Sequence, residues 1–293
     1  MKPPKDYRHR LKIYVLLVLA TLNAFVWYAA LAEDRGGKLT VAFLDIGQGD
    51  AIFIEAPSGN QALIDGGPPS GKVLSELGRM MPFYDRDIDV VIATHPDQDH
   101  IGGLPEVFKR YRVGVLFEPG VPSDNGDYLA MEQAGEKAGI QKILARAGMK
   151  IHLDKNTTIE IFYPDRDLPA RIDTNRASIV VRLTYGNKSF LFTGDLPKAE
   201  EEYLVGKNGA ALRSNVLKFG HHGSRTSVSE MFLTDVAPEY AVASAGKDNR
   251  YGHPHQEVLD LAEKYRVPVL RTDLHGRIVF TTDGNTISYS VQK

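Results

Sequence analysis

Short apolar runs alternate with amphipathic stretches through most of the chain after residue 38, and Gly- and Asp-rich turns separate them. Apolar runs bounded by turn residues predict strands, and a 3.6-residue periodicity predicts helices. Strands are predicted at 39–44, 51–55, 62–64, 90–93, 113–117, 159–163, 179–184, 189–193, 216–219, 240–244, 269–271, 276–281 and 286–291. Helices are predicted at 72–81, 104–111, 128–138, 199–204, 229–236 and 256–265.

These elements predict a mixed α/β (α+β) architecture. The run 90–93 is entirely apolar, which is typical of a strand buried on both faces. Two strand pairs read as hairpins, 179–184 with 189–193 and 276–281 with 286–291. Because hairpins and strand–helix units occur in both halves, we expect two mixed sheets packed face to face with helices outside. The polar loops 120–127 and 164–175 are expected to rim a cleft.

Residues 13–32 form an uncharged apolar segment, long enough to cross a bilayer core of roughly 30 Å. The flank 1–12 has five basic side chains and one acidic one, which predicts a cytoplasmic amino terminus and an exported body. Ala30-Leu31-Ala32 also resembles a signal-peptidase site. An uncleaved anchor is the favoured interpretation, with a cleaved signal and secretion after Ala32, or a buried helix, as alternatives. A linker at 33–38 then leads to one globular domain at 39–293.

Charge and cysteine content narrow the possible functions. The net charge is −2 overall and −6 after residue 12, so the body lacks the basic surface of a general nucleic-acid binder. The chain has no cysteine, which excludes disulfides, thiolate ligands and a cysteine nucleophile. Any bound metal must therefore be held by nitrogen and oxygen atoms.

The segment A-T-H-P-D-Q-D-H-I-G-G at 93–103 has the highest density of residues suited to metal chemistry. His95, Asp97, Asp99 and His100 lie within six positions, directly after the apolar run 90–93. Side chains along a strand point to alternate faces, so a cluster this tight is expected on the loop that leaves the strand. Imidazole nitrogen and carboxylate oxygen are ligands of divalent metals, and the segment therefore predicts a metal site.

This segment resembles the H-x-[HD]-x-D-H signature of the metallo-β-lactamase superfamily. Asp97, where most members have His, resembles the ComEC-type competence proteins and a phosphorylcholine esterase branch. Six more segments resemble the same branch in the same order, so the resemblance covers 39–292. They are FLDIGQGDA at 43–51, LIDGG at 63–67, FTGD at 192–195, LKFGHHGS at 217–224, YGHPH at 251–255 and RTDLHG at 271–276. The resemblance implies a four-layer αββα sandwich, whereas one apolar segment cannot supply ComEC's membrane channel.

The resemblance further implies two divalent metal ions, zinc or manganese, held by seven side chains. They are His95, Asp97 and His221 at the first ion, Asp99, His100 and His253 at the second, and Asp195 between the two. Asp195 and His221 each follow a predicted strand, as the first cluster does. The alternatives His222 for His221 and His255 for His253 stay open.

Other positions are assigned roles by the same resemblance. Asp65 is expected to orient a metal-binding histidine, with a turn residue as the alternative, and Asp50 is a weaker candidate of the same kind. Asp99 and His222 are expected to be catalytic, because His222 is placed to contact the phosphate or protonate the leaving oxygen. Expected substrate contacts are Asn175, Ser178, Ser224 and Arg225.

The branch acts on phosphodiesters, and two metals supply a hydroxide as nucleophile between them. The favoured hypothesis is a membrane-anchored nuclease acting on DNA outside the cytoplasmic membrane, as in DNA uptake during competence. A phosphoesterase on small or cell-envelope phosphodiesters is the alternative, favoured by the acidic body unless the cleft is locally basic. Such a patch is expected from Lys218, Arg225, Lys247 and Arg250. A non-catalytic envelope binding protein is a third hypothesis, and no protein partner is inferable.

Overall fold

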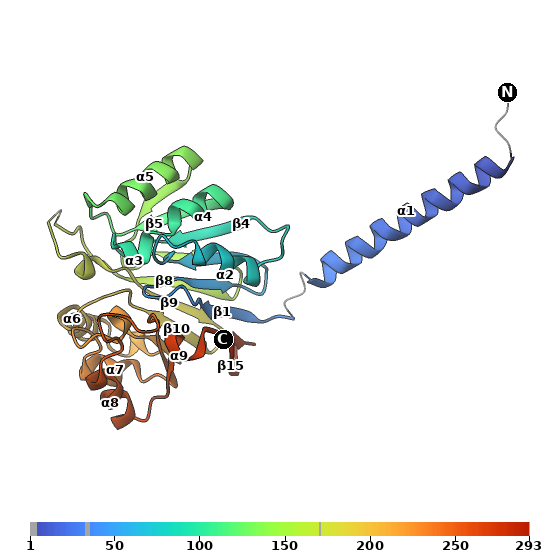
Figure 1. Ribbon diagram of the computed structural model, residues 1–293. Helices are drawn as coiled ribbons and strands as arrows, with labels where there is room; N and C mark the ends of the chain where they lie inside the picture. Colours follow the sequence, from blue (N-terminus) through green and yellow to red (C-terminus); the bar gives the residue numbers. More distant parts are fainter. Residues whose placement is uncertain (1–4, 33–35, 170, 293) are drawn as a thin grey trace. The chain divides into compact units, whose positions relative to one another are not determined.

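The computed structural model describes residues 5–32, 36–169 and 171–292, which belong to two compact units, 1–37 and 38–293. The first unit contains one helix, α1 (Lys5–Ala32), coloured blue in Figure 1. Its segment His9–Tyr28 is long and apolar enough to cross a membrane by length and composition. The Thr21 hydroxyl donates to the carbonyl of Leu17 at 2.9 Å, which satisfies a polar group that lipid could not. An apolar helix is thus present where the sequence predicts one, and its cleavage and orientation stay predictions.

The second unit contains two sheets. The first has the strand order β15-β14-β1-β2-β3-β4-β5-β6 and the second β13-β12-β11-β10-β9-β8-β7. The first sheet consists of β1 (Leu39–Phe43), β2 (Ile52–Glu55), β3 (Gln61–Ile64), β4 (Asp87–Ile92), β5 (Arg112–Glu118), β6 (Gln141–Leu144), β14 (Arg277–Thr282) and β15 (Ile287–Gln292). The second consists of β7 (Lys150–His152), β8 (Thr157–Tyr163), β9 (Val180–Tyr185), β10 (Lys188–Phe192), β11 (Val216–Lys218), β12 (Tyr240–Ala243) and β13 (Val269–Arg271).

Helices cover the outer face of each sheet, so the unit has the four layers predicted from the sequence (Figure 1). On the first sheet they are α2 (Lys72–Met80), α3 (Gln98–Ile101), α4 (Leu104–Arg110) and α5 (Gly126–Ala138). On the second they are α6 (Lys198–Asn208), α7 (Glu230–Val236) and α8 (Gln256–Lys264). The short segments are α9 (Thr272–His275) and the 3₁₀ turns η1 (Thr174–Ala177), η2 (Gly209–Leu212) and η3 (Gly220–Gly223).

Three apolar cores hold these layers together. The central core lies between the sheets, where the rings of Phe43, Phe192 and Phe280 pack with centroids about 6 Å apart. The other two lie between each sheet and its helices. In β1, Val41 and Phe43 enter the central core while Ala42 faces the helices. Burial on both faces explains why these strands are continuous apolar runs rather than alternating ones.

The predicted α/β sandwich is confirmed, but two strands were not predicted. Gln141–Leu144 and Lys150–His152 form the edge strands β6 and β7, and their side chains are mostly exposed. An edge strand has a neighbouring strand on one side only, so its side chains can be exposed to water and need not alternate between apolar and polar. The strand predicted at 90–93 instead spans 87–92. Its first residues include two aspartates, so they are not part of an apolar run.

The sheet topology brings several loops to one edge. In the first sheet β3, β4 and β5 are parallel, and in the second β10, β11 and β12 are parallel. Residues that follow parallel strands of one sheet share an edge. The start of antiparallel β2 lies at this edge as well, because Ile52 pairs with Ile64 at the end of β3.

Candidate metal centre

The loops that leave β4 and β10 meet at the common edge of the two sheets. The Nε2 atom of His100 lies 3.2 Å from Oδ1 of Asp195, and the amide of Ile179 donates to the carbonyl of Thr94 at 3.0 Å. Side chains contributed by both sheets therefore share one small volume. Only the packing of the two sheets creates this volume, since these residues are about a hundred positions apart in sequence.

The loop after β4 is short and leads into helix α3. This places its histidine and aspartate side chains close together. His95 and His100 are buried, and their ring centroids lie 4.1 Å apart. Asp97 precedes the helix but makes no capping hydrogen bond, and its Oδ2 lies 3.7 Å from Nε2 of His95. The predicted cluster on the loop after a buried strand is thus what the fold forms.

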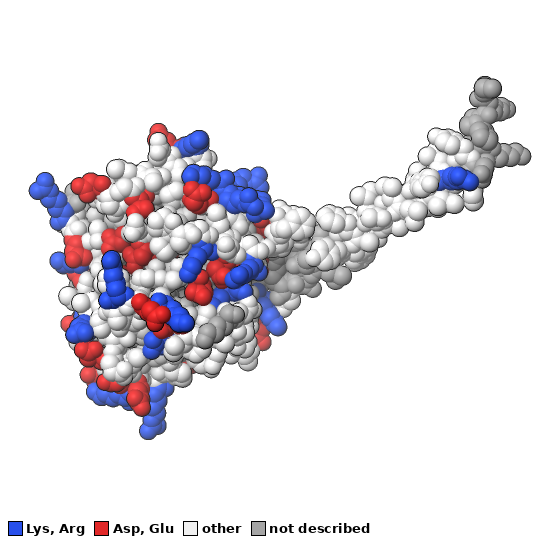
Figure 2. Space-filling view, viewed as in Figure 1, with Lys and Arg blue, Asp and Glu red and all other residues white. Residues whose placement is uncertain are grey.

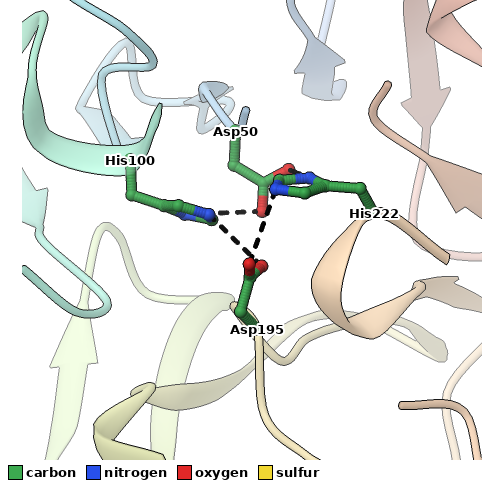
Figure 3. A group of neighbouring side chains, drawn as sticks. All are labelled: Asp50, His100, Asp195 and His222. Atoms are coloured by element: carbon green, nitrogen blue, oxygen red, sulfur yellow. Dashed lines mark ion pairs between the residues drawn. The ribbon is translucent and has the colours of Figure 1, made fainter. Parts of the chain in front are cut away.

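Asp195 directs its carboxylate toward Asp50, His100 and His222 (Figure 3). Its carboxylate faces Nε2 of His100 at 3.2 Å, Nε2 of His222 at 3.5 Å and Nε2 of His221 at 3.7 Å. Asp50, His100, Asp195 and His222 each direct a ligand atom into a space in which these atoms lie within 4.8 Å of one another. One carboxylate that faces three imidazoles is suited to the shared position predicted for Asp195.

The adjacent histidines of the 217–224 motif both face Asp195 but differ in burial and in their other neighbours. Both adopt left-handed backbone conformations, with φ of 49° for His221 and 56° for His222. Two consecutive non-glycine residues in this region are uncommon and cost of order 1–3 kcal/mol each, which is typical of functional sites. His222 is 1% exposed and its Nε2 lies 3.1 Å from Oδ2 of Asp99, whereas the His221 side chain is 27% exposed.

Asp65 lies behind His100. Its Oδ2 is 2.8 Å from Nδ1 of His100, and its two oxygens accept from the amide and hydroxyl of Thr94. A carboxylate on the far nitrogen of a ligand histidine fixes its tautomer and raises its basicity. This geometry fits the orienting role predicted for Asp65 rather than that of a turn residue, although Asp65 also has a left-handed φ of 58°.

His253 and His255 differ in whether a ring nitrogen remains available. The Nδ1 atom of His255 accepts from the amide of Arg225 at 3.0 Å, so that nitrogen is engaged. His253 is buried with its Nδ1 unpartnered, and its ring lies 5.4 Å from that of His221. The contacts therefore favour His253 as the member of the pair that faces the site.

Asp50, only a weak candidate in the sequence, is 1% exposed and lies against the centre. Its amide donates to the carbonyl of Asp99 at 3.1 Å, an approach that requires glycine at position 49. A Cβ there would lie 2.0 Å from that carbonyl oxygen. The prediction that Lys218 belongs to an accessible basic patch is wrong, because Lys218 is 0% exposed beneath the centre. Asp50 and Asp195 lie against its ammonium and draw it inward.

The predicted substrate residues lie in two environments. Ser178 is fully buried, and its hydroxyl accepts from the amide of Asp195 at 3.0 Å, so it holds a ligand loop. Ser224 is also buried and accepts from the Thr226 hydroxyl. Asn175 lies on η1 with a buried, unpartnered Oδ1. Arg225 is exposed, 3.6 Å from Glu257.

Burial and charge separate the histidines into two electrostatic classes. Burial, and then the charge of His100, lower the pKa of His95 to about 3, and burial with the neighbouring histidines lowers the pKa of His253 to about 4. Burial also opposes the charged form of His222, but Asp195 and Asp50 raise its pKa to about 9. Asp195 and Asp65 similarly raise the pKa of His100.

The residues present fit a metal ion. Buried, unpartnered polar atoms converge on the site, and such atoms are costly unless something binds them. They include Nε2 of His95, Nε2 of His100 and Oδ1 of Asp195. Nitrogen and oxygen donors of this kind suit zinc or manganese. Which side chains bind, and how many ions, stay predictions.

Comparison with known proteins gives consistent findings. A family model for the metallo-beta-lactamase superfamily matches residues 44–247. ComE operon protein 3 of Bacillus subtilis is 34% identical over 272 residues, covering 86% of this chain and 34% of that protein. Competence protein ComA of Neisseria gonorrhoeae is 33% identical over 271 residues, covering 92% and 36%. The chain thus spans about a third of the length of these relatives.

Among solved structures, the metallo-beta-lactamase fold protein YhfI from Bacillus subtilis matches with a TM-score of 0.56 at 13% identity. The match covers 84% of this chain and 99% of YhfI. At this identity the likeness concerns the fold, and it extends over nearly all of the second unit.

Proposed function

Since the chain belongs to the metallo-beta-lactamase superfamily, with relatives among the ComEC-type competence proteins, we propose that it is a two-metal phosphodiesterase. The proposed substrate is DNA, met outside the cytoplasmic membrane by a domain that α1 anchors. The observation that carries the proposal is Asp195, whose carboxylate faces His100, His221 and His222 from one buried position.

The contacts support a ligand arrangement that differs from the sequence prediction at three histidines. We propose that Asp99, His100 and His222 hold one ion, that His95 and Asp97 hold the other, and that Asp195 contacts both. His222 takes the place predicted for His253 because its Nε2 faces both Asp99 and Asp195, and neither His253 nor His221 is assigned to an ion. When bound, the two ions would lower the pKa of a water and bind a phosphoryl oxygen. The more exposed His221 then remains for the substrate side of the centre.

The charge of the site supports two ions rather than one. Five carboxylates line it, and the ammonium of Lys218 lies among them. When all are ionised their net charge is −4, which two divalent cations balance. One cation would leave a buried charge of −2, which is unfavourable in a low-dielectric interior. The carboxylates are Asp50, Asp65, Asp97, Asp99 and Asp195.

A cleft of about 430 Å³ opens beside Asp97 and Asp99 and supports access of a substrate to the centre. Its lining also includes the polar side chains of Gln48, Gln98 and Asn249, together with Arg250 and Tyr251. The guanidinium of Arg250 lies 4.9 Å from the centroid of the Tyr251 ring, which is half-exposed. Proteins that bind single-stranded nucleic acids use cationic side chains to contact the phosphates and aromatic rings on which the bases stack.

Charge distribution limits the extent of DNA contact. Basic and acidic side chains are interspersed over the face shown in Figure 2, without a continuous basic surface. We therefore propose that the cleft binds a few nucleotides of a single strand, rather than a long duplex. The alternative substrate, a small or cell-envelope phosphodiester, is shorter than the few nucleotides of DNA proposed here. A non-catalytic binding protein is less well supported, because binding alone does not require converging ligand atoms.

A substrate panel with added Mn²⁺ or Zn²⁺ tests the proposal. It contains single-stranded DNA, duplex DNA, bis(p-nitrophenyl) phosphate, p-nitrophenylphosphorylcholine and nitrocefin, with the Asp195→Ala chain as control. We expect cleavage of single-stranded DNA and of bis(p-nitrophenyl) phosphate, lost in the control. Preference for the phosphorylcholine ester would favour the envelope alternative. Nitrocefin cleavage alone, or no cleavage by metal-loaded protein, would contradict the phosphodiesterase.

A further inference from the structure

Lys218 is a fully buried lysine at the end of β11, directly beneath the candidate metal centre. Its ammonium donates to the carbonyl of Gly194 at 2.8 Å and forms an ion pair with Asp50. It also lies 3.6 Å from Oδ1 of Asp195. With no exposed surface, Lys218 cannot touch a substrate, so its effect must pass through these neighbours.

Asp50 connects Lys218 to the imidazole of His222. One oxygen of Asp50 contacts the ammonium, and the other lies 3.5 Å from Nδ1 of His222. The opposite ring nitrogen of His222, Nε2, faces Asp99 at 3.1 Å (Figure 3 shows Asp50 and His222 together). The chain of contacts therefore runs from Lys218 through Asp50 and His222 into the centre.

The Asp50–His222 pair resembles the Asp65–His100 pair in arrangement, with a longer separation of 3.5 Å against 2.8 Å. In both, a buried carboxylate lies behind Nδ1 of a histidine whose Nε2 points into the site. Asp65 is itself held by the amide and hydroxyl of Thr94. For Asp50 the corresponding holder is the ammonium of Lys218, which forms an ion pair with its carboxylate.

We propose that Lys218 is a positioning residue for the metal centre, acting through Asp50 on the orientation of His222. This inference rests on the proposed two-metal function. Because the same ammonium binds the carbonyl beside Asp195, it fixes loops from both sheets around one point. The proposal predicts that loss of Lys218 impairs the ion at Asp99, His100 and His222 more than the ion at His95 and Asp97.

The sign of the effect separates positioning from simple charge. Removing a positive charge near Asp195 would, by Coulomb attraction alone, strengthen binding of a cation. Removing a positioning contact behind a ligand histidine typically weakens metal affinity by about 10–100-fold. A loss of affinity in a Lys218 variant therefore indicates positioning, and a gain indicates that Lys218 only repels the metal.

Zn²⁺ titration of the chelator-treated full-length chain in detergent, followed by calorimetry, tests this. For Lys218→Met we expect one of two binding events to weaken by about 10–100-fold and the other to stay near its wild-type value. The matched control is Arg277→Met, which breaks another buried ion pair, Arg277 to Glu76 at 2.8 Å, and whose other side-chain hydrogen bond is to Gln292 rather than to a proposed ligand. It should leave both binding events unchanged.

Further variants guard against a Lys218→Met chain that fails to fold because Asp50 is left buried and unpaired. Asp50→Asn alone and the Asp50→Asn, Lys218→Met pair should reproduce the same single weakened event, without additivity. Unchanged or tighter Zn²⁺ binding in any folded variant would overturn the proposal, as would equal weakening of both events. A wild-type chain that binds no Zn²⁺ would instead overturn the proposed metal centre itself.

Discussion

The two sides of the candidate metal centre are held in different ways. On the His100 side, formed by Asp99, His100 and His222, a carboxylate lies behind each imidazole: Asp65 for His100 and Asp50 for His222. On the His95 side, formed by His95 and Asp97, Nδ1 of His95 faces only hydroxyls. They belong to Thr94 at 3.0 Å and Ser178 at 3.4 Å.

In this arrangement one protein gives two ions unlike sites. A carboxylate behind an imidazole raises the basicity of the ligand nitrogen, whereas a hydroxyl does so less. Against the effect of burial, Asp195 and Asp50 keep His222 protonated in the metal-free protein, with its pKa raised to about 9, while burial keeps His95 neutral. The His100 side should therefore bind its ion more tightly, but only after releasing protons.

The largest expected effect is the loss of the contact shared by both sides. Asp195→Ala should lose both ions, because one carboxylate serves the two sides, and hydrolysis should fall to the level of the chelator-treated protein. Elemental analysis of the purified chain checks the metal content. One ion retained at full occupancy would refute the shared position of Asp195.

The next effect separates the paired histidines. His222→Ala should remove the ion of the His100 side only, since its Nε2 faces Asp99 and Asp195. His221→Ala should keep both ions, yet slow DNA cleavage by about 10²–10⁴ if it transfers a proton to the leaving oxygen. Metal content and cleavage rates of both variants give the answer. The reverse pattern would restore the assignment of His221 as ligand and His222 as acid.

A third test uses pH to distinguish the sides. Below a pKa of about 9 His222 holds a proton that metal must displace, so affinity on the His100 side should rise with pH. The expected slope is about tenfold per pH unit for each proton released, between pH 6 and 9. His95, with a pKa of about 3, is neutral across this range, so the His95 side should change little. Parallel slopes for both ions in calorimetric titrations would contradict the difference.

The smallest effect comes from the residues behind the ligands. Asp65→Asn should weaken the ion of the His100 side by about 10–100-fold, because Nδ1 of His100 loses a carboxylate. Ser178→Ala, which removes a hydroxyl 3.4 Å from His95, should weaken the other ion by less than about tenfold. Zn²⁺ titrations of the two variants compare them directly, and a larger loss in Ser178→Ala would reverse the ranking.

Much of the fold can be predicted because its strands are buried on both faces. Apolar runs indicate β1, β4 and β10. The candidate ligands that follow β4 and β10 lie at the ends of these strands, as predicted. The edge strands β6 and β7 were not predicted because their mostly exposed side chains form no apolar run. Local pattern therefore suffices for the core and fails at the sheet edges.

The centre was predicted less completely, because its details depend on tertiary contacts. His221 and His222 are two left-handed residues in succession, both facing Asp195 but unequally buried, and no pattern in the sequence predicts that conformation. Because Lys218 lies at the end of a strand, the sequence suggests a lysine on the surface. In the structure it is buried, and its ammonium pairs with Asp50 and Asp195, which are distant in sequence. Asp50 likewise gains its importance only when β2 and β4 bring it to Asp99.

Crystals of the wild-type chain grown with Mn²⁺ would locate the ions by anomalous scattering at the manganese edge. We expect two peaks, both in contact with the Asp195 carboxylate. One should lie beside Asp99, His100 and His222, and the other beside His95 and Asp97. A single peak, or two peaks that do not share Asp195, would contradict the two-sided centre proposed for this protein.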